Sequence, residues 1–263
     1  MELGFEGKLA LVSGSTAGIG LAIATTLAEE GAGVIVNGRT QMAVDRVKTR
    51  LRSVARGDVH GFAGDLGRAE VAEEIAQRFP EVDILVNNLG IFEPKPFEEI
   101  SDADWMRFFE MNVLSGVRLA RLYLPRMRRV DWGRIIFISS ESAVQIPAEM
   151  IHYGMTKTAQ LAIARGVAET VAGTGITVNC VLPGPTESEG VAQFVADLAK
   201  QRSVGRSEVE AEFFQTARPT SLLKRFATVE EVANMIVYVC SPLASATTGA
   251  ALRVDGGVIR AIV

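Results

Sequence analysis

Tyr153 and Lys157 are the residues whose types and spacing point most directly to chemistry. A separation of four positions places both side chains on one face of a helix, so the lysine ammonium can stabilise a tyrosine phenolate. The pKa of the phenol, ordinarily ~10, can then fall toward the working range of a general acid or base. Such pairs also arise by chance on solvated helices. The weight of this pair therefore depends on the other motifs of the chain.

A glycine-rich turn near the start of the chain provides a candidate site for a dinucleotide. Gly14, Gly18 and Gly20 follow the apolar segment 9–12. Glycines let the backbone turn sharply and approach a pyrophosphate, while the first amides of the next helix point at the phosphates. The spacing G-x-x-x-G-x-G differs from the general G-x-G-x-x-G fingerprint. A plain strand-to-helix turn would not need three glycines, so we interpret this turn as a cofactor site.

The elements that must position these residues alternate along the chain. Short β-branched runs alternate with longer helical patterns, which is typical of a parallel sheet covered by helices on both faces. Strands are expected at 9–13, 33–37, 59–63, 84–87, 134–139, 177–182 and 251–254. Helices are expected at 19–30, 41–55, 70–78, 102–127, 151–172 and 229–240. The sequence predicts an α/β fold, a doubly wound parallel sheet of seven strands in a single domain over residues 1–263.

The segment 183–220 interrupts this alternation and is rich in Ser, Thr, Glu and Arg. A long irregular excursion in a compact α/β domain is more often a lid or binding loop than a scaffold element, so we expect a substrate lid at 184–220. Its apolar side chains could cover a substrate, or could dock against the body or a neighbouring subunit. They are Val191, Phe194, Leu198, Phe213 and Phe214. Four carboxylates could make the entrance acidic and, facing inward, disfavour anionic substrates: Glu141, Glu149, Glu187 and Glu189.

The composition disfavours several classes of protein. A net charge of -4 and a pI near 5.4 argue against a nucleic-acid binder, which needs clustered positive charge. No segment reaches the ~18 apolar residues of a membrane helix, and the start shows no leader pattern, so we expect a cytoplasmic protein.

Cys180 and Cys240 lie in apolar surroundings and look like buried free thiols. His60 is interpreted as structural and His152 as a surface or subunit contact, and no catalytic metal is expected.

The motifs follow one another in a recognisable order. After the glycine turn come NNLG at 87–90, Asn112, Ser140, the Tyr153 and Lys157 pair, NCVLPG at 179–184 and VDGG at 254–257. Together they resemble the short-chain dehydrogenase/reductase family in its compact single-domain branch, and are similar to 3-oxoacyl-carrier-protein reductase-like oxidoreductases. The resemblance covers nearly the whole chain and implies a Rossmann-like fold and hydride transfer. Ser13 and Leu89 depart from the family's usual Thr and Ala, and neither departure removes a catalytic group.

The resemblance implies a role for each of four residues. Tyr153 would be the general acid in reduction and the general base in oxidation, and Ser140 would hydrogen-bond the substrate oxygen. Lys157 would hold the phenolate and bind the nicotinamide ribose, and Asn112 would support Lys157 through an ordered water in a proton relay. A carbonyl that becomes an alkoxide does need a positioned donor and a proton source. Taken singly, Ser140 could be an ordinary strand end and Asn112 could cap a helix break.

The resemblance also implies a set of cofactor contacts. They are Gly14, Ser15, Thr16, Gly18, Ile19, Gly20, Arg39, Asp65, Leu66, Asn88, Gly90, Tyr153, Lys157, Pro183, Gly184 and Thr186.

The end of the second strand bears on the choice between NADP and NAD. A carboxylate there would bind both ribose hydroxyls, whereas an arginine would pair with a 2′-phosphate. No acidic residue occurs between Glu30 and Asp45, and Arg39 stands where NADP-preferring members of the family often place a basic residue. We therefore expect NADP(H). NAD stays open, because Ala17 is not the second basic residue of many such members and Arg39 could be a solvated loop charge.

The predicted function is an NADP(H)-dependent oxidoreductase that acts on a small molecule bearing a ketone, a 3-oxo group or a secondary alcohol. One alternative is an NAD-dependent alcohol, sugar or steroid dehydrogenase, and another is a non-catalytic nucleotide-binding sensor or scaffold. The resemblance further implies a homotetramer that pairs the helices at 102–127 and 151–172. Burial within one subunit would explain the apolar residues of those helices equally well.

Overall fold

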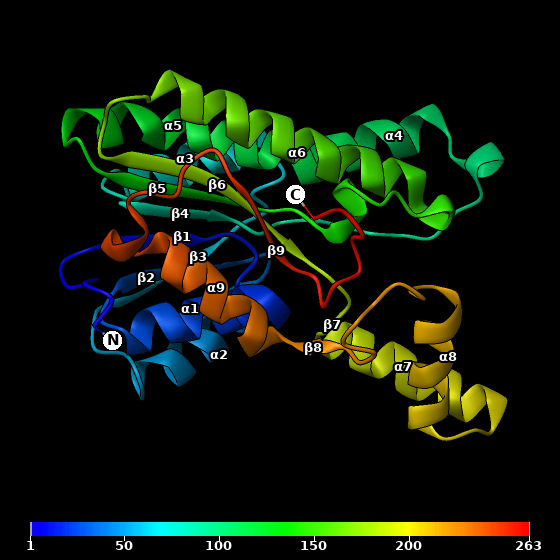
Figure 1. Cartoon of the computed structure of the whole chain (residues 1–263). Helices are drawn as coiled ribbons and strands as arrows, with labels where there is room; N and C mark the ends of the chain where they lie inside the picture. Colours follow the sequence, from blue (N-terminus) through cyan, green and yellow to red (C-terminus); the bar gives the residue numbers. More distant parts are fainter. Residues whose placement is uncertain (1, 263) are drawn as a thin grey trace.

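The computed structural model describes residues 2–262, apart from the side chain of Phe194, and is built around one parallel sheet (Figure 1). The sheet has seven strands in the order β3-β2-β1-β4-β5-β6-β9. Their bounds are β1 Leu9–Val12, β2 Gly33–Gly38, β3 Val59–Ala63, β4 Ile84–Asn87, β5 Gly133–Ile138, β6 Ile176–Pro183 and β9 Ala251–Val254. Each neighbouring pair is parallel. A short parallel pair, β7 Thr186–Glu187 and β8 Ala227–Thr228, lies outside it.

Helices cover both faces of the sheet (Figure 1). One face carries α1 Gly18–Glu29, α2 Gln41–Arg52 and α9 Val229–Cys240. The other carries α3 Ala69–Arg78, α4 Asp102–Phe109, α5 Ser115–Arg129 and α6 Ile151–Thr170. Because successive strand residues point to opposite faces, Ala10 and Val12 join one apolar cluster and Leu11 joins the other. Because helices cover both faces, the central strands β5 and β6 are buried along their whole length, and most of their residues are apolar. The predicted doubly wound fold is confirmed.

The helix expected at 102–127 is interrupted. A π-helical turn at Glu110–Leu114 separates α4 from α5. The side chain of Asn112 in this turn is buried and bonded to other segments. A single π-turn inside a helix often marks a functional residue, because the extra residue re-aims a side chain.

The 184–220 segment is more ordered than expected. It contains α7 Glu189–Arg202 and α8 Arg206–Thr216, which project from the body in yellow (Figure 1). Ser188 caps α7 by accepting a hydrogen bond from the amide of Val191, and Val195, Ala199 and Val209 form a small core between the two helices. The expectation of an irregular excursion is wrong, because apolar residues at helical spacing give these two helices a core of their own.

His152 is not at the surface. Its side chain is fully buried, and its ring lies 4.0 Å from the ring of Phe108 and 6.0 Å from that of Trp105, centroid to centroid. The expected surface or subunit contact is therefore wrong, because α4 packs over this side of α6. Burial lowers the pKa of His152, so the ring stays neutral at neutral pH.

Three further observations concern ligands and membranes. Cys180 and Cys240 are buried and free, as expected. Between residues 2 and 262, no cluster of three or more His, Cys, Asp or Glu side chains could hold a metal ion. Over the same residues, no helix combines the length and the apolar character needed to cross a membrane.

Candidate active site

The candidate site lies where the parallel strands end. Their carboxyl ends share one edge of the sheet, and the strand order reverses between β1 and β4, where ligands bind in open α/β sheets. The glycine turn follows β1, Asn88 follows β4, Ser140 lies just beyond β5, and Gly184 follows β6. Residues far apart in sequence are thus brought to one edge by the topology.

Tyr153 and Lys157 lie side by side on α6, as their spacing predicts. The Lys157 ammonium nitrogen is 5.6 Å from the centroid of the Tyr153 ring. Nζ donates a hydrogen bond of 2.8 Å to the carbonyl of Ile138, and the lysine is only 4% exposed. Burial lowers the pKa of Lys157 to about 8, since the charged form loses its hydration. Lys157 is still mostly protonated at neutral pH.

The pKa of Tyr153 moves in the opposite direction from the one expected. Burial raises it, and hydrogen bonding with Ser140 opposes that shift only in part. The expected fall is wrong for this structure, because loss of hydration around the phenolate outweighs the groups that would stabilise it. Tyr153 is therefore a protonated phenol at neutral pH, the form that can donate a proton.

Ser140 lies beside Tyr153 in the described site. Its side chain is 6% exposed and accepts a hydrogen bond of 3.1 Å from the amide of Ser142. Its hydroxyl donates to Oε2 of Glu141. Ser140 also caps the 3₁₀ turn Glu141–Ala143, so the structural and the catalytic interpretations of this serine are compatible.

Asn112 is held by both ends of its amide. Oδ1 accepts from the amide of Ile91 at 2.7 Å, while Nδ2 donates to the Ile91 carbonyl at 3.0 Å and to Oγ1 of Thr156 at 3.0 Å. A Cβ built on Gly90 would lie 3.5 Å from Oδ1 of Asn112 and 3.5 Å from Nζ of Lys157. Asn112 and Lys157 therefore converge beside Gly90.

Gln160 is a member of this group that the sequence reasoning missed. Its side chain is 1% exposed, and its amide nitrogen donates a 2.6 Å hydrogen bond to the main-chain carbonyl of Asn112. The position is one turn beyond Lys157 on α6, so helical spacing could have identified it.

The glycine turn has the shape that a pyrophosphate site needs. Gly14 has a φ of +61°, which favours glycine. A Cβ on Gly20 would lie 2.5 Å from Nδ2 of Asn88 and 2.6 Å from the carbonyl of Gly14, so no larger residue fits. The extended residue before α1 is Ala17, which supplies no side-chain cap. The first amides of α1 are thus left for an anionic ligand, and these features fit a dinucleotide.

Other predicted cofactor residues divide into open and buried ones. Arg39 is exposed just after β2, and the side chain of Thr16 lies against Gly38, where an added Cβ would clash with Cγ2 of Thr16. Ser15 is buried, and its hydroxyl donates to the Val12 carbonyl at 2.8 Å, so its side chain supports the turn. Leu66 is also fully buried, in the core, which does not support the adenine contact predicted for it.

The remaining positions lie at the same edge. Oδ1 of Asp65 accepts a hydrogen bond of 3.0 Å from the amide of Gly67. Thr186 is 8% exposed, and its hydroxyl donates to the Gly184 carbonyl at 2.9 Å. Pro183 is the last residue of β6, and Ile19, next to Gly18, is partly exposed in the first turn of α1.

A cavity of about 570 Å³ opens beside Ser140 and Tyr153. Apolar side chains from the 184–220 segment and from just beyond it form much of its far wall: Val191, Val195, Leu198, Val209, Phe213 and Phe226. Phe214 is buried away from this wall, and the side chain of Phe194 lies outside the described residues.

Of the four expected carboxylates, Glu141 and Glu149 line the cavity. Glu187 instead forms an ion pair with Arg206, and neither Glu187 nor Glu189 lines it.

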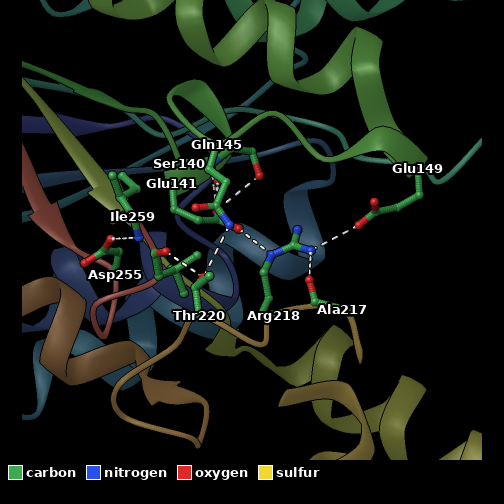
Figure 2. Close-up of polar contacts among 12 residues, drawn as sticks. Ser140, Glu141, Gln145, Glu149, Ala217, Arg218, Thr220, Asp255 and Ile259 are labelled. Carbon is green, nitrogen blue, oxygen red and sulfur yellow. Dashed lines mark hydrogen bonds and ion pairs between the residues drawn. The ribbon is translucent and has the colours of Figure 1, made fainter. Parts of the chain in front are cut away.

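Arg218 changes the charge of this entrance and was missed by the sequence reasoning. It lies 8% exposed just after α8, and its Nε donates to Oε1 of Glu141 at 2.8 Å (Figure 2). It is one arginine among many in the sequence and stands 77 positions from Glu141. Nothing in the spacing of the sequence joins the two.

Comparisons with known proteins match the chain over almost its whole length. The family model described as enoyl-(acyl carrier protein) reductase matches residues 14–259. The uncharacterized oxidoreductase YvaG of Bacillus subtilis (strain 168) is 49% identical over 263 residues, which cover 100% of both chains. The D-beta-hydroxybutyrate dehydrogenase of Rhizobium meliloti (strain 1021) is 34% identical over 257 residues, covering 95% of this chain and 98% of that one. The crystal structure of L-sorbose reductase from Gluconobacter frateurii, complexed with NADPH and L-sorbose, matches with a TM-score of 0.94 at 31% identity and covers 100% of both chains.

The doubly wound sheet and the residues at its edge define an oxidoreductase that acts on CH-OH or C=O groups. The family match extends from the glycine turn to the segment after β9. The chain belongs to the short-chain dehydrogenase/reductase family.

Proposed function

We propose that this protein is an NADP(H)-dependent reductase of a ketone or 3-oxo group, working reversibly on the secondary alcohol through Asn112, Ser140, Tyr153 and Lys157. The observation that carries the proposal is the cavity whose wall includes Ser140 and Tyr153, with Lys157 directly behind the tyrosine ring. A substrate oxygen in this cavity meets two hydroxyl groups at once. That is the arrangement an acid catalyst needs beside a developing alkoxide.

The protein's own groups divide the work of reduction. The Tyr153 phenol, protonated because burial raises its pKa, gives its proton to the substrate oxygen. Ser140 orients that oxygen, and the ammonium of Lys157 stabilises the phenolate left behind. Asn112, bonded to Ile91 and Thr156, fixes the wall against which Lys157 lies. The hydride itself comes from the reduced nicotinamide when the dinucleotide is bound.

NADP(H) is the cofactor that the site supports best. Gly14, Gly18, Ile19 and Gly20 would hold the pyrophosphate against the start of α1, with Asn88 behind them. Arg39 would meet a 2′-phosphate, with Thr16 against the preceding Gly38, and the related L-sorbose reductase is complexed with NADPH. The remaining contacts would come from Ser15, Asp65, Gly90, Pro183, Gly184 and Thr186. Leu66, whose side chain is in the core, would contribute through its main chain.

The 184–220 segment would serve as the substrate lid, since α7 and α8 form the wall opposite Tyr153. We further propose a cytoplasmic homotetramer. The face shared by α5 and α6 supports it, because Ala120, Leu124, Ile163 and Val167 line an open groove there. Light scattering at micromolar concentration would test it, and a monomeric mass would contradict it.

Calorimetric titration with NADPH and, separately, NADH tests the cofactor assignment. We expect NADPH to bind more tightly, and we expect Arg39→Ala to weaken NADPH binding while leaving NADH binding nearly unchanged. Preference for NADH would instead support the NAD-dependent dehydrogenase. Absence of NADPH oxidation across a broad panel of ketones would favour the non-catalytic sensor and overturn the proposed activity.

A further inference from the structure

Three charged side chains form a row along one wall of the cavity (Figure 2). Arg218 donates from Nε to Oε1 of Glu141 at 2.8 Å and from Nη1 to Oε1 of Glu149 at 3.1 Å. Glu141 is 4% exposed and Arg218 is 8% exposed, whereas the side chain of Glu149 is 49% exposed. Burying an ion pair costs hydration that its mutual attraction barely repays, so this pair is weak as a stability device.

The row begins at the proposed catalytic serine. Oε2 of Glu141 accepts hydrogen bonds from the hydroxyl of Ser140 and from the amide of Ser142, the latter at 2.9 Å. Ser140 and Tyr153 both line the cavity. Hydrogen bonds therefore run from Ser140 through Glu141 to Arg218, and Tyr153 lines the same cavity. Glu141 and Arg218 line the same cavity as Ser140 and Tyr153, so they are available to a polar group close to the reacting carbonyl.

Arg218 is held in place and still has capacity to bind. Its Nη1 also donates to the carbonyl of Ala217 at 2.8 Å, and two residues on, the hydroxyl of Thr220 donates to the carbonyl of Val258 at 2.7 Å. Within residues 2–262, the other terminal nitrogen, Nη2, has no hydrogen-bond partner and carries no dashed line in Figure 2. Nη2 is not among the buried polar atoms that lack a partner, so it keeps accessible surface on a residue that lines the cavity.

The charge of the row selects against anions. Two carboxylates face one guanidinium, and the other charged pair of the cavity, Arg202 with Glu212, joins opposite charges at 2.7 Å. The wall thus carries an excess of negative charge. A substrate carboxylate at Arg218 would be the third anion around one cation, whereas a hydroxyl can accept from Nη2 and donate to a glutamate.

We propose that Glu141, Arg218 and Glu149 form a recognition site for an uncharged hydroxyl group next to the reacting carbonyl, so that the preferred substrates are neutral hydroxyketones. This assignment rests on the proposed reductase activity. The rest of the substrate meets the apolar wall of Val191, Val195 and Leu198, which suits an alkyl or aryl substituent.

The first test compares matched ketones in an NADPH oxidation assay. Butan-2-one and 3-hydroxybutan-2-one differ by one hydroxyl, and 3-oxobutanoate and its methyl ester differ by one charge. We expect kcat/KM to favour the hydroxyketone by about tenfold, as a hydrogen bond to a charged group implies, and the ester over the anion by a similar factor. Equal kcat/KM values within both pairs would overturn this recognition site, but the proposed reductase activity would still hold.

Variants then assign the preference to the row. Glu149→Gln removes one negative charge from a half-exposed side chain, and we expect it to reduce the preference for the ester over 3-oxobutanoate at least threefold. Glu73→Gln makes the same change of charge on the exposed face of α3 and should leave the ratio of kcat/KM for the ester over 3-oxobutanoate unchanged.

The double variant Glu141→Gln/Arg218→Met replaces the buried ion pair by two neutral side chains. Its ratio of kcat/KM for the hydroxyketone over butan-2-one should approach one. Unchanged ratios in both Glu149→Gln and the double variant would overturn the proposal. No turnover of any ketone by the wild type would instead overturn the reductase on which it rests.

Discussion

Replacing Arg218 by Met should destabilise the protein strongly, because it leaves Glu141 as an unpaired buried carboxylate. Removing one partner of a buried ion pair costs ~3–5 kcal/mol. Oε2 of Glu141 keeps its contacts with Ser140 and Ser142, while Oε1 loses its 2.8 Å contact with Arg218. Half of the carboxylate therefore stays hydrogen-bonded. We expect a loss in the free energy of unfolding at the lower end of that range, about 3 kcal/mol.

Urea denaturation followed by circular dichroism measures this loss directly. In a chain of this size it corresponds to a fall in Tm of roughly 6–12 °C. Adding Glu141→Gln in the same chain removes the unpaired charge, so most of the stability should return. The control is Arg165→Met, which breaks an exposed pair with Glu169 and should give no measurable change. If Arg218→Met unfolds at the same urea concentration as Arg165→Met, the unpaired Glu141 carboxylate does not destabilise the fold, and the reasoning is refuted.

Three further predictions concern the reaction and its cofactor. Tyr153→Phe should lower kcat at least ~1000-fold with little change in the Kd for NADPH, since only the proton donor is lost; turnover close to wild type would contradict the mechanism. Gly20→Ala should abolish NADPH binding in calorimetry, because the new Cβ would lie 2.6 Å from the Gly14 carbonyl; unaltered affinity would mean that the turn does not hold the pyrophosphate. Ketone reduction should fall as pH rises through about 8, where Lys157, with its lowered pKa, loses its charge. The pKa of Tyr153 is raised, so the phenol keeps its proton there, and a rate that stays flat to high pH would contradict the role of Lys157.

The sequence predicts the fold well because each element has a local signal. The strands predicted at 59–63 and 84–87 and the helix predicted at 229–240 have the bounds that the structure shows. Alternation of β-branched runs and helical patterns is a short-range property, and parallel topology follows from it. The spacing of Tyr153 and Lys157 is also local, which is why it predicts their proximity.

Features that depend on tertiary packing could not be predicted from local sequence patterns. The side of α6 that carries His152 is covered by α4, and no pattern within α6 shows which helix lies there. The direction of the Tyr153 pKa depends on burial, which outweighs the neighbouring groups. The pairing of Arg218 with Glu141 depends on where the chain returns after α8, 77 positions away. Motif spacing does not encode any of these three.

The separate core of α7 and α8 has a consequence for how such a protein can diversify. Val195, Ala199 and Val209 pack with one another and do not belong to either of the two clusters that flank the sheet. Mutations in this small cluster therefore do not change the residues that pack the two clusters beside the sheet. In a grafting experiment, residues 189–216 from a relative could be transplanted as a unit to change substrate range. This unit ends before Arg218, so the graft keeps the buried pair of Arg218 and Glu141 intact; a longer graft that replaced Arg218 alone would leave Glu141 as an unpaired buried charge.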